Sequence, residues 1–253
     1  MAKKPTPVIP KKSLPKPQPK TAKTVQTSGG EGNWLKLGLV VLAITAACYL
    51  PSLRHDFVNW DDPKNITENE NLLLVGKGQP WGTTISNIFD LEKGNVIGNY
   101  NPLPILTFAI EKALNGGEFS PKLTHFTNLL LHLLTVFFVM KLLWGMGIGR
   151  WGVLAGGLLF GIHPMRVESV AWATERKDVL FAVFFFAALV YYIRWLYQTK
   201  RAETARPATD QGSGGTTYLI MIVLALLSGF SKVQAVTLPL SMLALDFWFR
   251  RSL

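Results

Sequence analysis

Long runs of apolar residues, separated by short polar segments, dominate the chain after residue 33. A helix needs about 20 apolar residues to cross the hydrocarbon core of a bilayer. Three runs come close to that length, at 35–53, 123–144 and 179–197. Three further runs are shorter, at 151–162, 218–230 and 233–249. The pattern predicts an all-α polytopic membrane protein with about six spanning helices.

The distribution of charge along the chain predicts its orientation, because cytoplasmic segments of membrane proteins carry an excess of Lys and Arg. With the N-terminus placed in the cytoplasm, the inner segments hold 16 Lys and Arg residues against 4 acids. The outer segments hold 10 against 12. Topology thus explains the net charge of +10, and nucleic-acid binding is not expected. We expect an integral membrane protein with its N-terminus in the cytoplasm, in contact with membrane lipid.

The chain divides into a tail and a membrane module. Residues 1–33 are rich in Lys, Pro, Thr and Gly, which predicts a disordered basic cytoplasmic tail. Residues 34–253 form the predicted membrane module, whose first extracytoplasmic loop covers 54–122. The aromatic content of this loop, with a helix expected at 104–114, predicts a packed element near the membrane surface. The lone Cys48 cannot form an intramolecular disulfide.

Two of the short runs, 151–162 and 218–230, lead into polar clusters on the outer side. The first cluster contains His163, Arg166 and Glu168, and the second contains Lys232. Polar groups at this depth are costly unless they pair or line a cavity. The sequence therefore favours a recessed outer cavity, with snorkelling of Arg166 and Lys232 into a thinner bilayer as the alternative.

Candidate chemical groups also lie on the outer side. The adjacent carboxylates of Asp61 and Asp62 could act as a general base, bind a metal or contact a polar substrate, although such a pair is also common in helix caps and turns. Arg176 and Lys177, followed by Asp178, could hold a phosphate, or could anchor a helix at the membrane interface. Participation of a divalent metal is left open.

Other features of the sequence predict packing rather than chemistry. His125 and His132 are seven residues apart on one helix face, and His132 is expected to have a hydrogen-bonded packing role. The 151–162 run has glycines at small-xxx-small spacing, which predicts close approach of a neighbouring helix. These glycines are Gly152, Gly156, Gly157 and Gly161. The sequence contains no phosphate-binding glycine loop, zinc-ligand spacing or nucleophile elbow.

Several strings of the sequence agree in order and spacing with one family. The string at 163–180, HPMRVESVAWATERKDVL, resembles the hallmark of the transmembrane-and-TPR-repeat-containing family in its bacterial form. Four further stretches agree with it: FVNWDD at 57–62, NYNPL at 99–103, HFTNLLLH at 125–132, and SK at 231–232 running into TLP at 237–239 and Asp246. The resemblance covers about residues 54–250.

The resemblance implies a GT-C glycosyltransferase that takes a sugar from a polyprenyl-phosphate donor on the outer membrane face. Its eukaryotic relatives are protein O-mannosyltransferases, which suggests mannose as the sugar and a protein as the acceptor. In such enzymes an acidic motif of the first outer loop serves the active site, which implies Asp61 and Asp62 as base or acceptor contact. The candidate substrate-binding residues are His163, Arg166, Glu168, Arg176, Lys177 and Lys232. Among them, chemical inference assigns the donor phosphate to Arg176 and Lys232.

The chain departs from the family in two respects. Many relatives have an acid after the Ser-Lys pair, where this chain has Val233 and Gln234. The family also has further spanning helices and a C-terminal TPR array, whereas no 34-residue helical repeat is present here. We therefore expect the N-terminal part of such an enzyme. A non-catalytic membrane scaffold is the main alternative function, and a transporter is a less favoured one.

Overall fold

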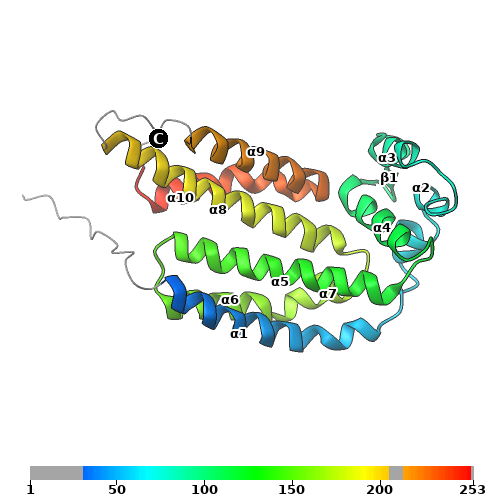
Figure 1. Cartoon of the computed structure of the whole chain (residues 1–253), viewed down its shortest axis with the longest axis horizontal. Helices are drawn as coiled ribbons and strands as arrows, with labels where there is room; N and C mark the ends of the chain where they lie inside the picture. The colour runs from blue at the N-terminus through cyan, green and yellow to red at the C-terminus, as the bar shows by residue number, and fades with distance from the viewer. Residues whose placement is uncertain (1–30, 205–212, 252–253) are drawn as a thin grey trace, which may run out of the picture.

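The computed structural model describes residues 31–204 and 213–251, and in these residues the fold is helical apart from one short strand pair. Six apolar helices lie side by side (Figure 1). They are α1 (Glu31–Tyr49), α5 (Pro121–Gly145), α6 (Arg150–Gly161), α8 (Arg176–Thr204), α9 (Ser213–Ser231) and α10 (Leu238–Trp248). The predicted all-α fold is confirmed for this part of the chain. Residues 1–30 of the predicted tail lie outside the described residues, and α1 begins at Glu31.

Four helical segments of the described chain are long and apolar enough to cross a membrane, which identifies an integral membrane protein. They are Trp34–Arg54, Pro121–Gly145, Arg176–Lys200 and Gly214–Ser231. The prediction of six spans is shown only in part. Helix α6 has 12 residues, and at about 1.5 Å rise per residue it covers roughly 18 Å. The last apolar helical segment, Val233–Trp248, is also shorter than a span.

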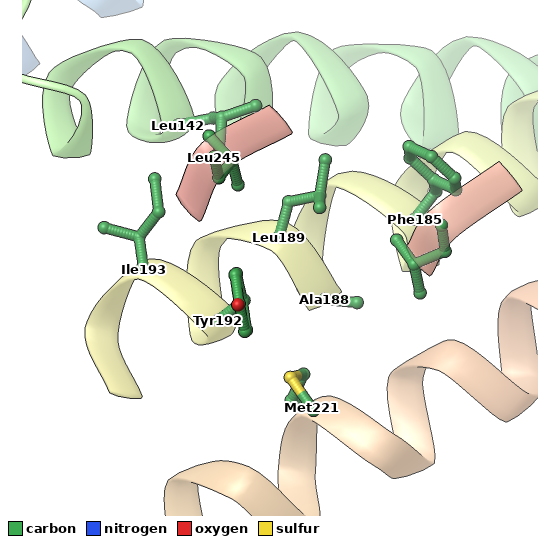
Figure 2. Close-up of a cluster of buried hydrophobic side chains, with 9 residues drawn as sticks. Leu142, Phe185, Ala188, Leu189, Tyr192, Ile193, Met221 and Leu245 are labelled. Atoms are coloured by element: carbon green, nitrogen blue, oxygen red, sulfur yellow. The ribbon is translucent and has the colours of Figure 1, made fainter. Parts of the chain in front are cut away.

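Helix α8 lies at the centre of one half of the bundle, between α5 and the pair α9 and α10. Its side chains form a buried cluster with apolar residues of these three neighbours (Figure 2). Within it, Leu189 and Ile193 of α8 pack in one core with Leu142 of α5 and Met221 of α9. The helix is therefore fixed on several sides, so its first turn is a rigid place for polar side chains.

Close packing of α6 against α1 and α5 depends on its glycines. A Cβ atom at Gly157 would lie 2.8 Å from Sδ of Met140 on α5, and one at Gly161 would lie 3.3 Å from Cγ2 of Thr45 on α1. Neither separation accommodates a side chain without a shift of the neighbour. The predicted role of these glycines in helix packing is confirmed.

The first loop folds into a small helical layer at one end of the bundle (Figure 1). After η1 (Leu50–Arg54), which continues α1, its helices are η2 (Pro63–Thr67), α2 (Glu70–Leu73), α3 (Trp81–Phe89) and α4 (Pro102–Leu114). Strands β1 (Asn95–Val96) and β2 (Asn99–Tyr100) pair antiparallel, and their turn places Ile97 and Gly98 at φ of 51° and 73°. The helix predicted at 104–114 is confirmed as α4, which begins two residues earlier because Pro102 suits the first helical turn.

The loop layer has its own apolar core, which reaches into the bundle. Buried Ile66, Leu72, Ile88 and Phe108 cluster there with Ala173, which belongs to the connection between α7 and α8. The short helices η3 (Pro164–Arg166) and α7 (Val167–Ala171) lead to this connection. A third short helix, η4 (Val233–Thr237), follows α9. The predicted packed element is therefore present, and it is tied to the segment that carries most of the candidate residues.

Candidate functional site

The segment between α7 and α8 joins the loop layer to the bundle. Backbone oxygens of Trp172 and Ala173 accept hydrogen bonds from Nδ2 of Asn128 on α5, at 3.0 and 3.5 Å. The next residue, Thr174, donates its backbone N–H and its hydroxyl to Oδ1 of Asp62. One short segment thus connects the acidic motif of the loop with a spanning helix.

Asp62 and Asp61 differ sharply in their surroundings. Asp62 is 1% exposed, and besides Thr174 it accepts a hydrogen bond from the backbone N–H of Val58 at 2.9 Å. Asp61 is half-buried, and its backbone oxygen accepts hydrogen bonds from Asn65 at 3.0 and 2.9 Å. Within the described chain the carboxylate of Asp61 forms no hydrogen bond or ion pair. Asp62 therefore anchors the loop, whereas the carboxylate of Asp61 has no partner among the described residues.

Arg176 is fully buried and committed to protein partners. Its guanidinium forms an ion pair with Glu111 of α4 at 2.7 Å, bonds to Oδ1 of Asn128, and donates to the backbone oxygen of Thr124 at 2.9 Å. It also lies 4.7 Å above the ring of Phe108. All three guanidinium nitrogens have partners, so Arg176 holds α4, α5 and α8 together.

The other cations of the motif form a partly exposed ionic cluster at the same end of the bundle. Lys177 pairs with Glu175 at 2.8 Å, and Lys232 lies 3.9 Å from the second oxygen of the same carboxylate. Lys232 also pairs with Asp178, which accepts a further hydrogen bond from Ser169 at 3.2 Å. We call Glu175, Lys177, Asp178 and Lys232 the ionic cluster. It brings together two sequence motifs that lie 55 residues apart along the chain, at Lys177 and Lys232.

Burial changes the pKa of Glu175, the acid that Lys177 and Lys232 share. The side chain of Glu175 is 12% exposed, and its burial raises the pKa of the carboxyl above the ordinary 4.5. Lys177 and Lys232 oppose that rise by favouring the charged form, and Asp178 adds to it. Glu175 is thus easier to protonate than an exposed glutamate.

The remaining candidates lie apart from this cluster. His163 is exposed, and its Nδ1 accepts a hydrogen bond from the backbone of Met165 at 3.2 Å. The guanidinium of Arg166 lies 5.2 Å above the ring of Phe160, and Glu168 is exposed. Among the described contacts, none joins these three side chains to Lys177 or Lys232.

The buried histidines of α5 have no catalytic arrangement around them. His132 bonds through Nε2 to the backbone oxygen of Gly161 at 2.8 Å, which confirms its predicted packing role. His125 is 1% exposed, and both its ring nitrogens are without a hydrogen-bond partner in the described chain. Across residues 31–204 and 213–251, no group of three His, Cys, Asp or Glu side chains could hold a metal ion.

Sequence reasoning did not identify the partners that organise this site. Glu111, Asn128 and Thr174 come from segments 44 to 112 residues away from the residues they bind. The sequence offered one signal for these partners. Arg176 and Lys232 lie beside apolar runs, and charges at such a depth need acids nearby. The recessed outer cavity remains a prediction, and two hollows of the described chain, lined by residues of the opposite end of the bundle, do not test it.

Fold and site together define a polytopic membrane protein with a folded loop and an ionic cluster at one end. The chain is homologous to the TMTC protein O-mannosyl-transferases, over their N-terminal transmembrane region. It is 30% identical over 202 residues to "Protein O-mannosyl-transferase Tmtc2" of Drosophila melanogaster, covering 79% of this chain and 20% of that protein. The family resemblance read from the sequence is thereby confirmed.

Human relatives match to a similar degree. Protein O-mannosyl-transferase TMTC4 of Homo sapiens is 28% identical over 81% of this chain and 28% of its own length. TMTC2 of Homo sapiens is 35% identical over 62% of this chain and 18% of its own length. The chain therefore spans between 18% and 28% of the length of these relatives. No family model matches the chain, and no solved structure matches it.

Proposed function

We propose that this chain is the membrane-embedded part of a GT-C glycosyltransferase that moves mannose from a polyprenyl phosphate to a protein hydroxyl. Homology to O-mannosyl-transferases supports the class of reaction. The observation that carries the proposal is the ionic cluster, in which Lys177 and Lys232 lie together beside the anchored acidic motif of the loop. Such a cluster suits a phosphate held at the end of a bundle whose helices accommodate a polyprenyl chain.

Lys177 and Lys232 are the proposed ligands of the donor phosphate. Both are partly exposed, whereas Arg176 is buried and has its guanidinium nitrogens bonded to protein atoms, so Arg176 is not retained in this role. A phosphate oxygen would replace the Glu175 carboxylate as partner of the two ammonium groups. The raised pKa of Glu175 favours this exchange, because the carboxyl can take up a proton as the phosphate arrives.

Asp61 is the proposed general base. Asp62 fixes the motif to Thr174, the residue directly before Glu175, so the free carboxylate of Asp61 is held near the ionic cluster. In the proposed reaction the acceptor oxygen attacks the anomeric carbon, the bond from that carbon to the phosphate oxygen breaks, and the hydroxyl proton passes to Asp61. The polyprenyl phosphate leaves with the bonding electron pair, and the exposed His163 and Glu168 remain available to bind substrate.

Transfer of radiolabelled mannose from polyprenyl phosphate in membranes tests this proposal. We expect the Asp61→Asn variant to lose at least about 100-fold in rate, since a general base contributes roughly 10²–10⁴-fold. Asp90→Asn, a matched change of an exposed aspartate at the end of α3, should leave the rate unchanged. Equal rates for the two variants would remove Asp61 from the mechanism.

The finer topology is part of the proposal. We infer six crossings, with the N-terminus in the cytoplasm of a bacterium and the loop layer outside. The excess of Lys and Arg in the inner segments supports this orientation. For the two short helices, α6 and α10, the adjoining turns η3 and η4 would complete the crossing in a locally thinned bilayer.

A non-catalytic scaffold is the second candidate function. The observation that favours it is the balance of the ionic cluster, in which two acids neutralise two lysines within the protein. In that case the cluster would be structural, and purified protein would neither transfer mannose nor bind the polyprenyl-phosphate donor. Donor binding without transfer would instead indicate that a further part of the enzyme is needed.

A further inference from the structure

A hollow of about 390 Å³ lies between α5 and α8, lined by residues from the halves of these helices that are remote from the loop layer. The residues around it are of three kinds, cationic, aromatic and aliphatic. They include Lys141, Trp144, Val190, Ile193, Arg194 and Tyr197. None of them belongs to the ionic cluster or to the acidic motif.

The cations of this hollow have no acidic partner. Lys141 and Arg194 are both exposed, and within the described chain neither forms a hydrogen bond or an ion pair. Lys141 makes one aromatic contact, with its ammonium 5.6 Å from the ring of Phe137. Among the described residues no Asp or Glu lines the hollow, so the potential that these residues create there favours an anion.

The walls of the hollow indicate that the anion carries an apolar chain. Val190, half-buried on α8, supplies aliphatic surface, and Trp144 and Tyr197 are residue types enriched where the bilayer meets water. The Tyr197 hydroxyl donates to the backbone oxygen of Gly145 at 3.0 Å, which fixes this wall between the two helices. A free phosphate would leave the aliphatic surface unused, whereas a phospholipid would use both parts.

A second hollow continues the basic surface. Its volume is about 260 Å³, and it shares Tyr197 with the first. Arg250 and Arg251 line it, and Arg251 lies 3.6 Å from Asp246. The excess of positive charge therefore extends beyond the first hollow, and it disfavours a headgroup that carries its own ammonium.

We propose that the hollow between α5 and α8 binds an anionic phospholipid of the phosphatidylglycerol type. The phosphodiester lies between Lys141 and Arg194, and an acyl chain covers Val190 and the rings of Trp144 and Tyr197. Basic pockets between spanning helices bind the head groups of anionic lipids in this way. The inference is independent of the proposed sugar transfer.

Native mass spectrometry of the full chain in detergent, titrated with dioleoylphosphatidylglycerol or dioleoylphosphatidylcholine, tests this proposal. Phosphatidylglycerol should bind at least tenfold more tightly than phosphatidylcholine. The double variant Lys141→Gln/Arg194→Gln should lose about 30-fold, because each Lys or Arg near an anionic lipid surface contributes roughly fivefold. The charge-retaining variant Lys141→Arg/Arg194→Lys should bind within threefold of the wild type.

The control removes two positive charges elsewhere. Lys64→Gln/Lys77→Gln changes exposed lysines of the loop layer and should leave the affinity for phosphatidylglycerol unchanged. Equal affinity for the two lipids, or equal loss in the two glutamine double variants, would overturn the proposal. A dimer that is lost in a Val190→Trp variant, with lipid binding intact, would assign the hollow to a second copy of the chain and overturn it as well.

Discussion

At the scale of single residues, the site separates buried side chains that hold structure from partly exposed ones that can meet a substrate. The sequence singled out Asp62 as one of two adjacent carboxylates and Arg176 as a cation that could hold a phosphate. In the structure both have protein partners: Arg176 pairs with Glu111, and Asp62 accepts hydrogen bonds from Thr174. A sequence shows that a charge needs a partner, but not which one, because these partners come from remote segments of the chain.

Arg176→Gln should be strongly destabilising. It leaves Glu111 buried without its cation, and breaking a buried pair in this way costs about 3–5 kcal/mol. The control is Arg54→Gln at an exposed arginine, for which a change within about 0.5 kcal/mol is expected. The free energies of unfolding of both variants, measured in detergent, would contradict this account if they were alike.

The raised pKa of Glu175 predicts a pH-dependent stability. Between the ordinary value of 4.5 and the raised value, the folded protein retains a proton that the unfolded chain has lost. The free energy of unfolding should therefore fall as the pH rises through this window. The decline should be smaller in Glu175→Gln and unchanged in Glu92→Gln, at an exposed loop residue. Thermal unfolding of the wild type and the two variants at a series of pH values measures this decline. An equal pH dependence in all three proteins would remove Glu175 as the source of the decline.

At the scale of elements, the apolar pattern predicted most helices but not all of their lengths. Helix α9 was expected from residue 218, yet it begins at Ser213, because helix formation extends into polar residues that hydropathy does not count. The glycines of α6 were correctly read as packing residues. The ionic cluster was only half predicted, since its lysines were recognised as site residues but their shared acid, Glu175, was not.

A substitution in α6 tests this packing. Gly157→Ala places a methyl group against Met140, and such overpacking costs about 1–3 kcal/mol. Gly82→Ala, in helix α3 with open space around it, should instead stabilise by roughly 0.5–1 kcal/mol. A melting temperature that rises in Gly157→Ala, as it should in Gly82→Ala, would show that α6 is not closely packed there.

At the scale of the whole molecule, the loop layer and the ionic cluster lie together at one end of the helices, while the basic hollow is lined by residues of the other end (Figure 1). This polarity agrees with the inferred orientation across a bacterial inner membrane. The homology to O-mannosyl-transferases covers most of this chain but only a fifth of the Drosophila relative. For this part of the enzyme, the central proposal is that the ionic cluster binds the polyprenyl-phosphate donor.

Single-cysteine labelling tests the orientation. In a Cys48→Ser background, a cysteine at Lys77 in the loop layer should react with a membrane-impermeant maleimide in intact cells. A cysteine at Arg150, where α6 begins, should react only after permeabilisation. The opposite pattern would invert the molecule in the membrane and place the proposed site in the cytoplasm.

The most direct measurement is the rate of mannose transfer from polyprenyl phosphate as a function of donor concentration, for the wild type and for Lys177→Gln/Lys232→Gln. If the two lysines hold the donor phosphate, the double variant should show a KM for the donor raised at least about tenfold, with the folded protein retained in the membrane. Lys64→Gln/Lys77→Gln should keep the wild-type KM. A donor KM that is unchanged in Lys177→Gln/Lys232→Gln would contradict the account, because the ionic cluster would then have no part in binding the donor.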